Sequence, residues 1–459
     1  MPTAPTADNP YSFSVKLKQH TPLIHFQWQQ EGATLRASEL KPKLDKFIWE
    51  VLMKQKPDWF EEKPTFLGKE CFPEIQGHKS GTFTVHIKAI GKPTYYLIGY
   101  IKGDKVHETK QDFIREFNLP TNDVKHISIA PFFAENEKLR NLNWVSKEGN
   151  IIKVGVMWKD GVEVVFRSMV PDFSSWLGKI AEYFFCVENF ATRQSKGFGC
   201  FTPDSWTQSN FETVVTQFFG SIFKKKLQNN LTEIFKAIHG DYQLLKAGRN
   251  DPYQKSYLFL YFCDKNIRWE KRIIKKSMKM IIDNPIYRTF NDSLESKREL
   301  APIDCQEENN WQSVQNSKYV RALLGLAETN EYLTSNRDIK YIINIKASAN
   351  NSEITRMQSS ILVKVFSDSI YFIPNKLEPE ILDKKFNFFL RKKYKNKLDD
   401  AIIFDKIKSN GKEEKRERPI VRELQVPNEF NVADFLDFAF NSSRNKEAIK
   451  DYITLSAHA

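Results

Sequence analysis

The order of hydrophobic patterns between residues 12 and 203 constrains the fold of this chain more than any other feature of its sequence. Residues 12–19 (SFSVKLKQ) alternate apolar and polar side chains, which predicts a strand with one buried face. Residues 38–55 then carry apolar side chains at helical spacing, and Ser38 is of a type that favours a helix N-cap. A strand followed by an amphipathic helix is therefore expected first.

A hairpin and a second helix are expected further along the chain. The segments 151–158 and 162–169 both alternate and flank an Asp-Gly pair at 160–161, which is typical of a type I′ hairpin turn. A helix is predicted over 173–191 because its large apolar residues share one face. The last strand should run through residues 200–201.

These elements give the order β-α-β-β-α-β, which is the ferredoxin-like plan and also that of RRM domains. The predicted fold class is α+β, with a flexible tail over 1–10 and a ferredoxin-like, RRM-like domain over 11–205. A β insertion over about 56–150, with strands at 82–90 and 94–101, follows the first helix. A sheet covered by helices on one face leaves its other face and its loops open for RNA.

Residues 206–459 are expected to form a mixed, largely helical α+β domain. Helices are predicted over 227–246, 318–333 and 431–440, the last of them capped by Asn431. Strands return at 339–346, 359–367 and 370–376. The patterns leave open whether this region contains a second ferredoxin-like unit.

The composition favours a polyanionic partner. The sequence has 69 Lys+Arg and 57 Asp+Glu, a formal net charge of +12, which fits nucleic acid first. The cysteines are scattered without a C-x-x-C pair, and no H-E-x-x-H occurs, so we expect a reduced, cytoplasmic compartment without metal or cofactor. No apolar run has the length of a membrane span, so no membrane partner is expected.

The stretch ATRQSKGFGCF (191–201) combines glycines, cations and an aromatic ring. Gly197 and Gly199 allow close approach of a ligand backbone, whereas Arg193 and Lys196 supply charge for phosphates. Phe198 can stack on a base. A glycine helix stop followed by a core phenylalanine explains the same spacing, and on spacing alone it is the more common arrangement.

Three further segments carry candidate RNA contacts. In EGATLRASELKPK (31–43), Arg36, Lys41 and Lys43 lie at a helix start, where they suit a phosphate although they oppose the helix dipole. In LLKAGRNDPYQKSY (244–257), Lys246 and Arg249 alternate with tyrosines, as in single-strand binders, but a basic structural loop fits equally. The amphipathic basic helix 271–282 is typical mainly of a solvated face over a core.

His25, near the end of the first strand, has the residue type of a general base. No second catalytic group is placed beside it by the sequence, and a structural histidine is the more common case.

LRASELKPKLDKFI (35–48) and RQSKGFGCF (193–201) together resemble the RAMP superfamily of CRISPR effector subunits. The helix start resembles the Cmr branch of type III-B complexes, above all the family of its first-numbered subunit. YVRALLGLAE (319–328) and RMQSSILVKVF (356–366) are similar to segments in the C-terminal half of that branch.

The resemblance implies an RNA-binding, non-catalytic subunit of an antiviral ribonucleoprotein complex, in contact with guide or target RNA near the guide 3′ end and with other RAMP subunits. Its expected RNA-binding residues are Arg36, Lys41, Lys43, Arg193, Lys196, Gly197, Phe198, Gly199, Lys246 and Arg249. Two alternatives stay open. One is a metal-independent RAMP endoribonuclease that processes guide precursors with His25 as base, and the other is a scaffold subunit without RNA contacts.

Overall fold

The chain divides into two structural units. A computed structural model describes residues 9–25, 27–52, 74–75, 78–129, 144–171, 173–228, 230–250, 252–281, 316–326, 329–333, 339–348, 357–394, 397–401, 404–409, 412–417, 419–441 and 449–456. Unit 1 comprises Met1–His239, Leu362–Ile373 and Ile453–Ala459, and unit 2 comprises Gly240–Ile361 and Pro374–Tyr452. The sequence patterns predicted one boundary after residue 205, whereas each of these units draws on separate stretches of the chain. The predicted tail over 1–10 lies largely outside the described residues.

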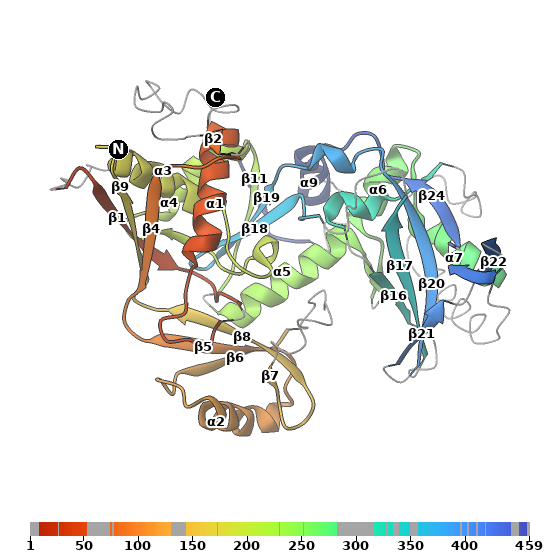
Figure 1. The fold of residues 1–459 in the computed structure, drawn as a ribbon, viewed down its shortest axis with the longest axis horizontal. Coiled ribbons are helices and arrows are strands. Elements are labelled where there is room, and N and C mark those ends of the chain that lie inside the picture. Colours follow the sequence, from red (N-terminus) through yellow and green to blue (C-terminus); the bar gives the residue numbers. More distant parts are fainter. Residues whose placement is uncertain are drawn as a thin grey trace. The chain divides into compact units, whose positions relative to one another are not determined.

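An antiparallel sheet organises the first part of unit 1 (Figure 1). Its strand order is β10 (Phe201–Pro203), β1 (Ser12–Gln19), β9 (Val162–Ser168) and β4 (Phe83–Ala89). Val15 of β1 lies opposite Val164, and both are buried, whereas Ser14 and Lys16 are exposed. The alternation in β1 therefore separates a core face from an open face, as its sequence predicts.

Two helices pack on the apolar face of this sheet. Helix α1 (Ala37–Lys46) continues into a π-helical turn over Phe47–Leu52, and α3 (Phe173–Val187) follows β9. Their buried side chains join those of the strands in one core, which includes Leu40, Leu44, Leu177, Phe184 and Val164. The helical spacing in the sequence thus marks the core faces of both helices correctly.

The hairpin predicted across 160–161 is wrong. Strand β8 (Ile151–Trp158) belongs to a different sheet from β9, and β9 pairs with β4 instead. Gly161 has a φ of +91°, and a Cβ there would stand 2.2 Å from the carbonyl oxygen of Leu17. The glycine therefore allows a close crossing over β1. Strand β8 is buried at the consecutive positions 154–156, so both of its faces must pack against other parts of the protein. The sheet that contains β9 has one exposed face and does not offer this.

The inserted module consequently lies between the second and third strands of the first sheet, not directly after the first helix. Its sheet has the order β6 (Val124–Ile127), β5 (Pro93–Ile98), β8 and β7 (Trp144–Val145). A 3-10 turn (Gly103–Lys105) and α2 (Val106–Phe117) connect the parallel pair β5 and β6. Phe113 of α2 stacks on Trp28 with ring centroids 5.4 Å apart, which anchors the module to the rest of unit 1. The short strands β2 (Glu74–Ile75) and β3 (His78–Lys79) precede β4.

A second sheet brings together strands that lie far apart in the sequence. Its order is β18 (Ile361–Phe366), β19 (Ser369–Pro374), β11 (Ile222–Lys226) and β25 (Ile453–Leu455). When the four strands of each of these two sheets are numbered 1 to 4 along the chain, their order across the sheet is 2-3-1-4. The first and second sheets of unit 1 share this order. The predicted helix 227–246 is confirmed as α5 (Leu231–Lys246), which follows β11 as α1 follows β1.

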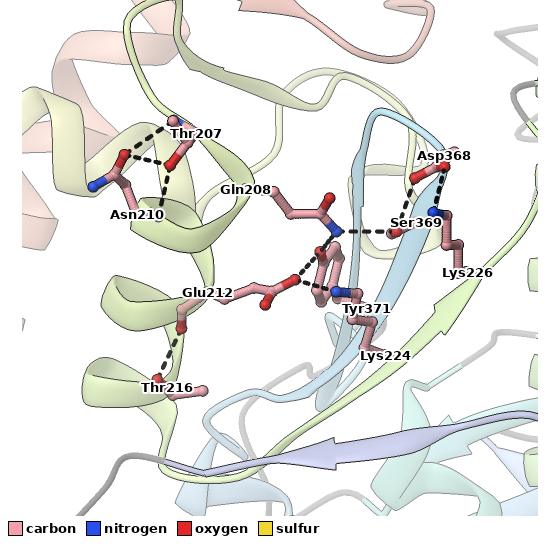
Figure 2. Close-up of polar contacts among 10 residues, drawn as sticks. All are labelled: Thr207, Gln208, Asn210, Glu212, Thr216, Lys224, Lys226, Asp368, Ser369 and Tyr371. Atoms are coloured by element: carbon pink, nitrogen blue, oxygen red, sulfur yellow. Dashed lines mark hydrogen bonds and ion pairs between the residues drawn. The ribbon is translucent and has the colours of Figure 1, made fainter.

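Helix α4 (Gln208–Phe219) is fixed to this sheet by a polar network (Figure 2). The hydroxyl of Tyr371 donates to Oε1 of Glu212 at 2.6 Å, and Nζ of Lys224 lies 2.6 Å from the same oxygen. Gln208 donates from Nε2 to the Tyr371 oxygen at 2.6 Å and to Oγ of Ser369 at 3.1 Å. Burial raises the pKa of Tyr371, so the phenol stays protonated and can donate to Glu212.

Unit 2 is built around the sheet β16-β17-β20-β21, with β24 pairing to β20. The predicted helix over 318–333 is wrong, because this segment forms β15, a 3-10 helix and β16. The helix predicted over 431–440 is confirmed as α9, and Asn431 Oδ1 accepts from the amide of Ala433 at 3.0 Å.

The elements of unit 2 are β12 (Arg249–Asn250), β13 (Tyr253–Gln254), α6 (Tyr257–Asp264), β14 (Arg268–Trp269), α7 (Glu270–Ile281), β15 (Ser317–Lys318), η7 (Val320–Leu324), β16 (Thr329–Leu333), β17 (Ile339–Ala347), η8 (Pro379–Ile381), β20 (Lys385–Tyr394), β21 (Lys397–Ala401), β22 (Phe404–Ser409), β23 (Lys412–Glu417), β24 (Val421–Gln425) and α9 (Val432–Asn441).

The structure is mixed α+β, as predicted. The largely helical character predicted for residues 206–459 is wrong, because strands outweigh helices among the described residues of this region. In the part of the chain that the structure describes, no helix combines the length and the apolar character needed to cross a bilayer.

A buried histidine connects the two sheets of unit 1. His20, just after β1, donates from Nε2 to Oγ1 of Thr202 at 2.7 Å, because its Nδ1 accepts from the amide of Ser367 at 3.2 Å. Burial, followed by the charges of Lys18 and Lys364, lowers the pKa of His20 to about 3. The neutral ring is therefore the form that fits this position.

We expect the stabilisation provided by His20 to decrease as the pH falls below 6.5, the ordinary pKa of the ring. The folded chain keeps the ring neutral to about pH 3, whereas the unfolded chain takes up a proton earlier, so acid favours unfolding. The difference in unfolding free energy between wild type and His20→Gln should shrink by about 2 kcal/mol between about pH 7 and about pH 5. Urea unfolding at both values measures it, and a difference that stays constant would contradict it.

Candidate nucleic-acid interface

The first turn of α1 lies against the loop that follows α3. The helix begins at Ala37 with Arg36 as its N-cap residue, so the cap precedes Ser38, the cap residue that the sequence suggested. The Arg36 backbone is extended (φ −110°), and its carbonyl accepts from the amide of Leu40 at 2.8 Å. This geometry directs the next turn, with Glu39 and Lys43, toward the loop.

Glu39 and Lys43 hold residues 189–194 in place. Oε1 of Glu39 accepts from the amide of Ala191 at 2.8 Å, and Nζ of Lys43 donates to the carbonyl of Asn189 at 2.9 Å. Lys43 also donates to the side-chain oxygen of Gln194 and lies 3.3 Å from Glu39. These bonds join two segments that are far apart in the sequence, and they use the Lys43 charge mainly to shape the loop.

Arg193 and Lys196 flank a short 3-10 turn (Gln194–Lys196) in this loop. Arg193 has a left-handed backbone (φ +61°), as does Ala191 (φ +62°), which is uncommon for residues other than glycine. The Arg193 guanidinium lies 5.8 Å from the ring centroid of Phe198, and burial lowers its pKa to about 10. Both cations are half-buried, and the Arg193 guanidinium stays charged at neutral pH. We call Arg36, Arg193 and Lys196, with the loop segment 191–196, the α1–loop surface.

The second half of the loop is a packing element, which corrects the roles predicted for Gly197, Phe198 and Gly199. The Phe198 ring is 1% exposed and stacks on Phe235 with centroids 4.0 Å apart, so it presents no face to a base. A Cβ on Gly199 would lie 2.1 Å from the carbonyl oxygen of Phe190, and one on Gly197 would lie 3.0 Å from Ile238. Both glycines also have positive φ, +80° at Gly197 and +65° at Gly199. The close approach that they permit is to the protein itself.

Strand β18 supports the loop from the other side, through residues that sequence analysis missed. Lys364 is fully buried and donates to the carbonyls of Phe185 at 2.8 Å and Glu188 at 2.7 Å, at the end of α3. Asn189 donates from Nδ2 to the carbonyls of Gln194 at 2.6 Å and Val363 at 2.8 Å. A lysine within the apolar run ILVKVF was the available signal.

Lys41 lies on a different side of α1 and serves the fold. Its ammonium donates to Asp45 at 3.0 Å, to Ser80 at 2.8 Å and to the carbonyl of Gly81 at 3.0 Å. These bonds occupy all three of its N–H groups. The ammonium also lies 4.4 Å from the centroid of the Phe83 ring. Lys41 thus connects α1 to the start of β4 and is not part of the α1–loop surface.

His25 lies close to the α1–loop surface but is buried. Its Nδ1 accepts from the amide of Gln27 at 3.0 Å, and its Nε2 has no hydrogen-bond partner among the described residues. Burial, followed by the charge of Arg36, lowers the pKa of His25 to about 4, although Glu39 opposes this shift. The ring is therefore a neutral, weak base at neutral pH.

Lys246 and Arg249 belong to unit 2, whereas the loop after α3 belongs to unit 1. Lys246 donates to the carbonyls of Leu324 at 3.1 Å and Gly325 at 2.7 Å. Arg249 lies in β12, opposite Gln254. Their predicted RNA contacts stay a prediction.

Comparison with known protein families covers nearly the whole chain. The Cmr1 N-terminal domain matches residues 11–249, and the Cmr1 C-terminal domain matches residues 253–455. No curated protein and no solved structure matches the chain.

Replacing Lys43 with methionine should loosen the loop without unfolding α1. The change leaves the Asn189 carbonyl and the Gln194 side chain without their charged donor, which should cost about 1–3 kcal/mol. We expect faster hydrogen–deuterium exchange at residues 189–196 than in wild type. Lys179→Met, at an exposed position of α3, is the matched control, and equal exchange in both variants would show that Lys43 does not hold the loop.

Proposed function

The chain belongs to the Cmr1 family, whose members are subunits of the type III-B CRISPR–Cas complex, and from this premise we propose that it is a non-catalytic subunit that binds RNA through its α1–loop surface. The RNA would be guide RNA, target RNA or both, near the guide 3′ end. Its other partners would be RAMP subunits of the same complex, in the cytoplasm.

The observation that supports the proposal is the convergence of the α1 start with residues 189–196. Arg36, Arg193 and Lys196 come from segments far apart in the sequence, and the Glu39 and Lys43 bonds to residues 189–194 keep those segments together. Lys43 pairs with Glu39 at 3.3 Å, and Arg36, Arg193 and Lys196 add three further cations to this surface. Such a group of cations favours a polyanion.

The buried aromatic rings of the loop indicate which part of RNA would be contacted. Phe190 and Phe198 are both at most 1% exposed, so neither offers a stacking surface. The charged residues of the α1–loop surface are arginine and lysine, which favour phosphates. We therefore expect contacts to the sugar–phosphate backbone, which position RNA without reading its sequence.

We further propose that each sheet of unit 1 belongs to one ferredoxin-like unit of a RAMP fold. The first unit would contain β1, α1, β4, β9, α3 and β10, and the second would contain β11, the start of α5, β18, β19 and β25. The shared strand order supports this assignment.

The non-catalytic part of the proposal is supported by the surroundings of His25. A ring with a pKa of about 4, buried and already hydrogen-bonded at Nδ1, is poorly suited to take a proton from a ribose 2′-hydroxyl. The two alternatives, an endoribonuclease and a scaffold without RNA contacts, are tested by the RNA cleavage and RNA retention experiments below.

Removing the two loop cations should weaken RNA retention and its salt dependence. Arg193→Asn keeps a residue that tolerates the left-handed backbone, and Lys196→Gln keeps the length of the side chain approximately. For single-stranded RNA, the log–log salt slope should become less negative by about 0.7 for each phosphate that the variant no longer neutralises. Filter binding across a salt series measures it.

Lys179→Gln serves as the control for charge alone. A double variant with the affinity and slope of this control would count against the α1–loop surface. Gly197→Val is unsuitable for this test, because the added side chain meets Ile238 in the core at a backbone φ of +80°.

Incubation of the purified chain with CRISPR repeat RNA in EDTA should leave the RNA intact. The expectation follows from the weak basicity of His25, and denaturing gel electrophoresis provides the measurement. Site-specific cleavage that disappears in His25→Ala would support the endoribonuclease and overturn the non-catalytic assignment.

A further inference from the structure

Unit 2 contains a group of charges that the α1–loop surface does not include. Lys246 from the end of α5, Lys271 from the first turn of α7 and Arg321 from η7 surround the single carboxylate of Glu270. In the sequence, residues 244–257 and 271–282 form two separate basic segments. We call Lys246, Glu270, Lys271 and Arg321 the unit 2 cation cluster.

A chain of short contacts joins its members. Lys271 donates from Nζ to the carbonyl of Ala247 at 3.3 Å, the residue next to Lys246. Lys246 donates to the carbonyls of Leu324 and Gly325, at the end of the 3-10 helix that carries Arg321. Arg321 in turn pairs with Glu270, which precedes Lys271, so the contacts close a ring.

The charges of this cluster do not balance. Glu270 is completely buried and is bonded to both Arg321 and the amide of Val320, the latter at 3.1 Å. Two half-buried ammonium groups remain with only carbonyl oxygens and the Trp269 ring, 4.4 Å from Lys271, as described partners. Poorly compensated charge in a partly buried site is costly, and a cation in the first turn of a helix also opposes the helix dipole.

The protonation equilibria agree with this imbalance. Burial, followed by the charge of Arg321, lowers the pKa of Lys246 to about 7, and the same two causes lower the pKa of Lys271 to about 7. The nearby Glu270 opposes both shifts without restoring the ordinary value. A bound anion would favour the charged form of each lysine.

A tetrahedral oxyanion matches the donors that the cluster presents. Among the described residues, Lys246 has bonds to two carbonyls and Lys271 to one, so each ammonium keeps donor capacity. We propose that the unit 2 cation cluster binds a phosphate group, carried either by RNA or by a free phosphate or nucleotide.

Calorimetric titration of the full-length chain with inorganic phosphate tests the site, with potassium chloride at matched ionic strength as the reference. Wild type should bind phosphate saturably. Lys271→Met should bind roughly tenfold more weakly or worse, because it lacks one charge-assisted hydrogen bond to the anion. Glu270→Gln should bind more tightly, because it removes the only carboxylate of the cluster while keeping an acceptor for Val320.

Thermal unfolding separates this role from a structural one. Lys271→Met removes a charge that Glu270 compensates only in part, so without phosphate it should unfold at the same temperature as wild type or higher, yet show no phosphate-induced rise. Lys236→Met, at an exposed pair on α5, should keep the full response. Equal phosphate affinity in wild type, Lys271→Met and Glu270→Gln would overturn the proposal, as would an equal response to chloride.

Competition identifies the source of the phosphate. A short oligoribonucleotide that displaces inorganic phosphate from wild type points to RNA, whereas displacement by a nucleotide alone points to a free ligand, and either result supports the site. Arg193→Asn/Lys196→Gln should keep its phosphate affinity. Failure of RNA retention at the α1–loop surface can therefore be distinguished from failure of the unit 2 cation cluster.

Discussion

Unit 1 depends on how the loop after α3 is held from two sides. Glu39 and Lys43 of α1 bind residues 189–194, while Asn189 and the buried Lys364 tie the same region to β18. Lys364 satisfies carbonyls at the end of α3, where a positive charge is favoured by the helix dipole. Together with the bond from the Thr192 amide to the Ile24 carbonyl, these bonds hold a loop in which Ala191 and Arg193 have left-handed backbones.

The same loop divides into an accessible and a buried half, and this division determines its chemistry. Residues 191–196 keep their cations near the surface, whereas Phe198 is stacked on Phe235 between the loop and α5. A glycine-rich loop that carries its aromatic ring into the core can offer charge to RNA but no stacking platform. The resulting surface is suited to holding the sugar–phosphate backbone of RNA. Other components of a complex would then recognise the base sequence.

Buried lysines occur in both units with different consequences. Lys364 donates to carbonyl oxygens at the end of α3 and has Glu188 nearby; burial lowers its pKa, and Glu188 opposes that shift. Lys246 and Lys271 also bond to carbonyls, but Arg321 stands beside them and pairs with Glu270, the one carboxylate that the described residues bring to the cluster. The first lysine therefore acts as a structural connector, whereas the other two are cations arranged to receive an anion.

The sequence by itself determined the elements whose signals are local. Strand β1, helix α3 and helix α9 were predicted because side-chain periodicity and the Asn431 cap act within a few residues. The candidate cations Arg193 and Lys196 were identified from their spacing in the same way.

The tertiary structure alone decided how distant segments pair. The Asp-Gly pair at 160–161 gave no information on whether β9 would join β8 or β4, because that choice depends on the cover available to each strand. The sequence allowed Phe198 to be either a stacking surface for a base or a core residue. In the structure its ring stacks on Phe235, and Val363 and Val365 lie close to the neighbouring Gly197. The meeting of Lys246, Lys271 and Arg321 was likewise unpredictable, since long-range packing leaves no periodic trace in the chain.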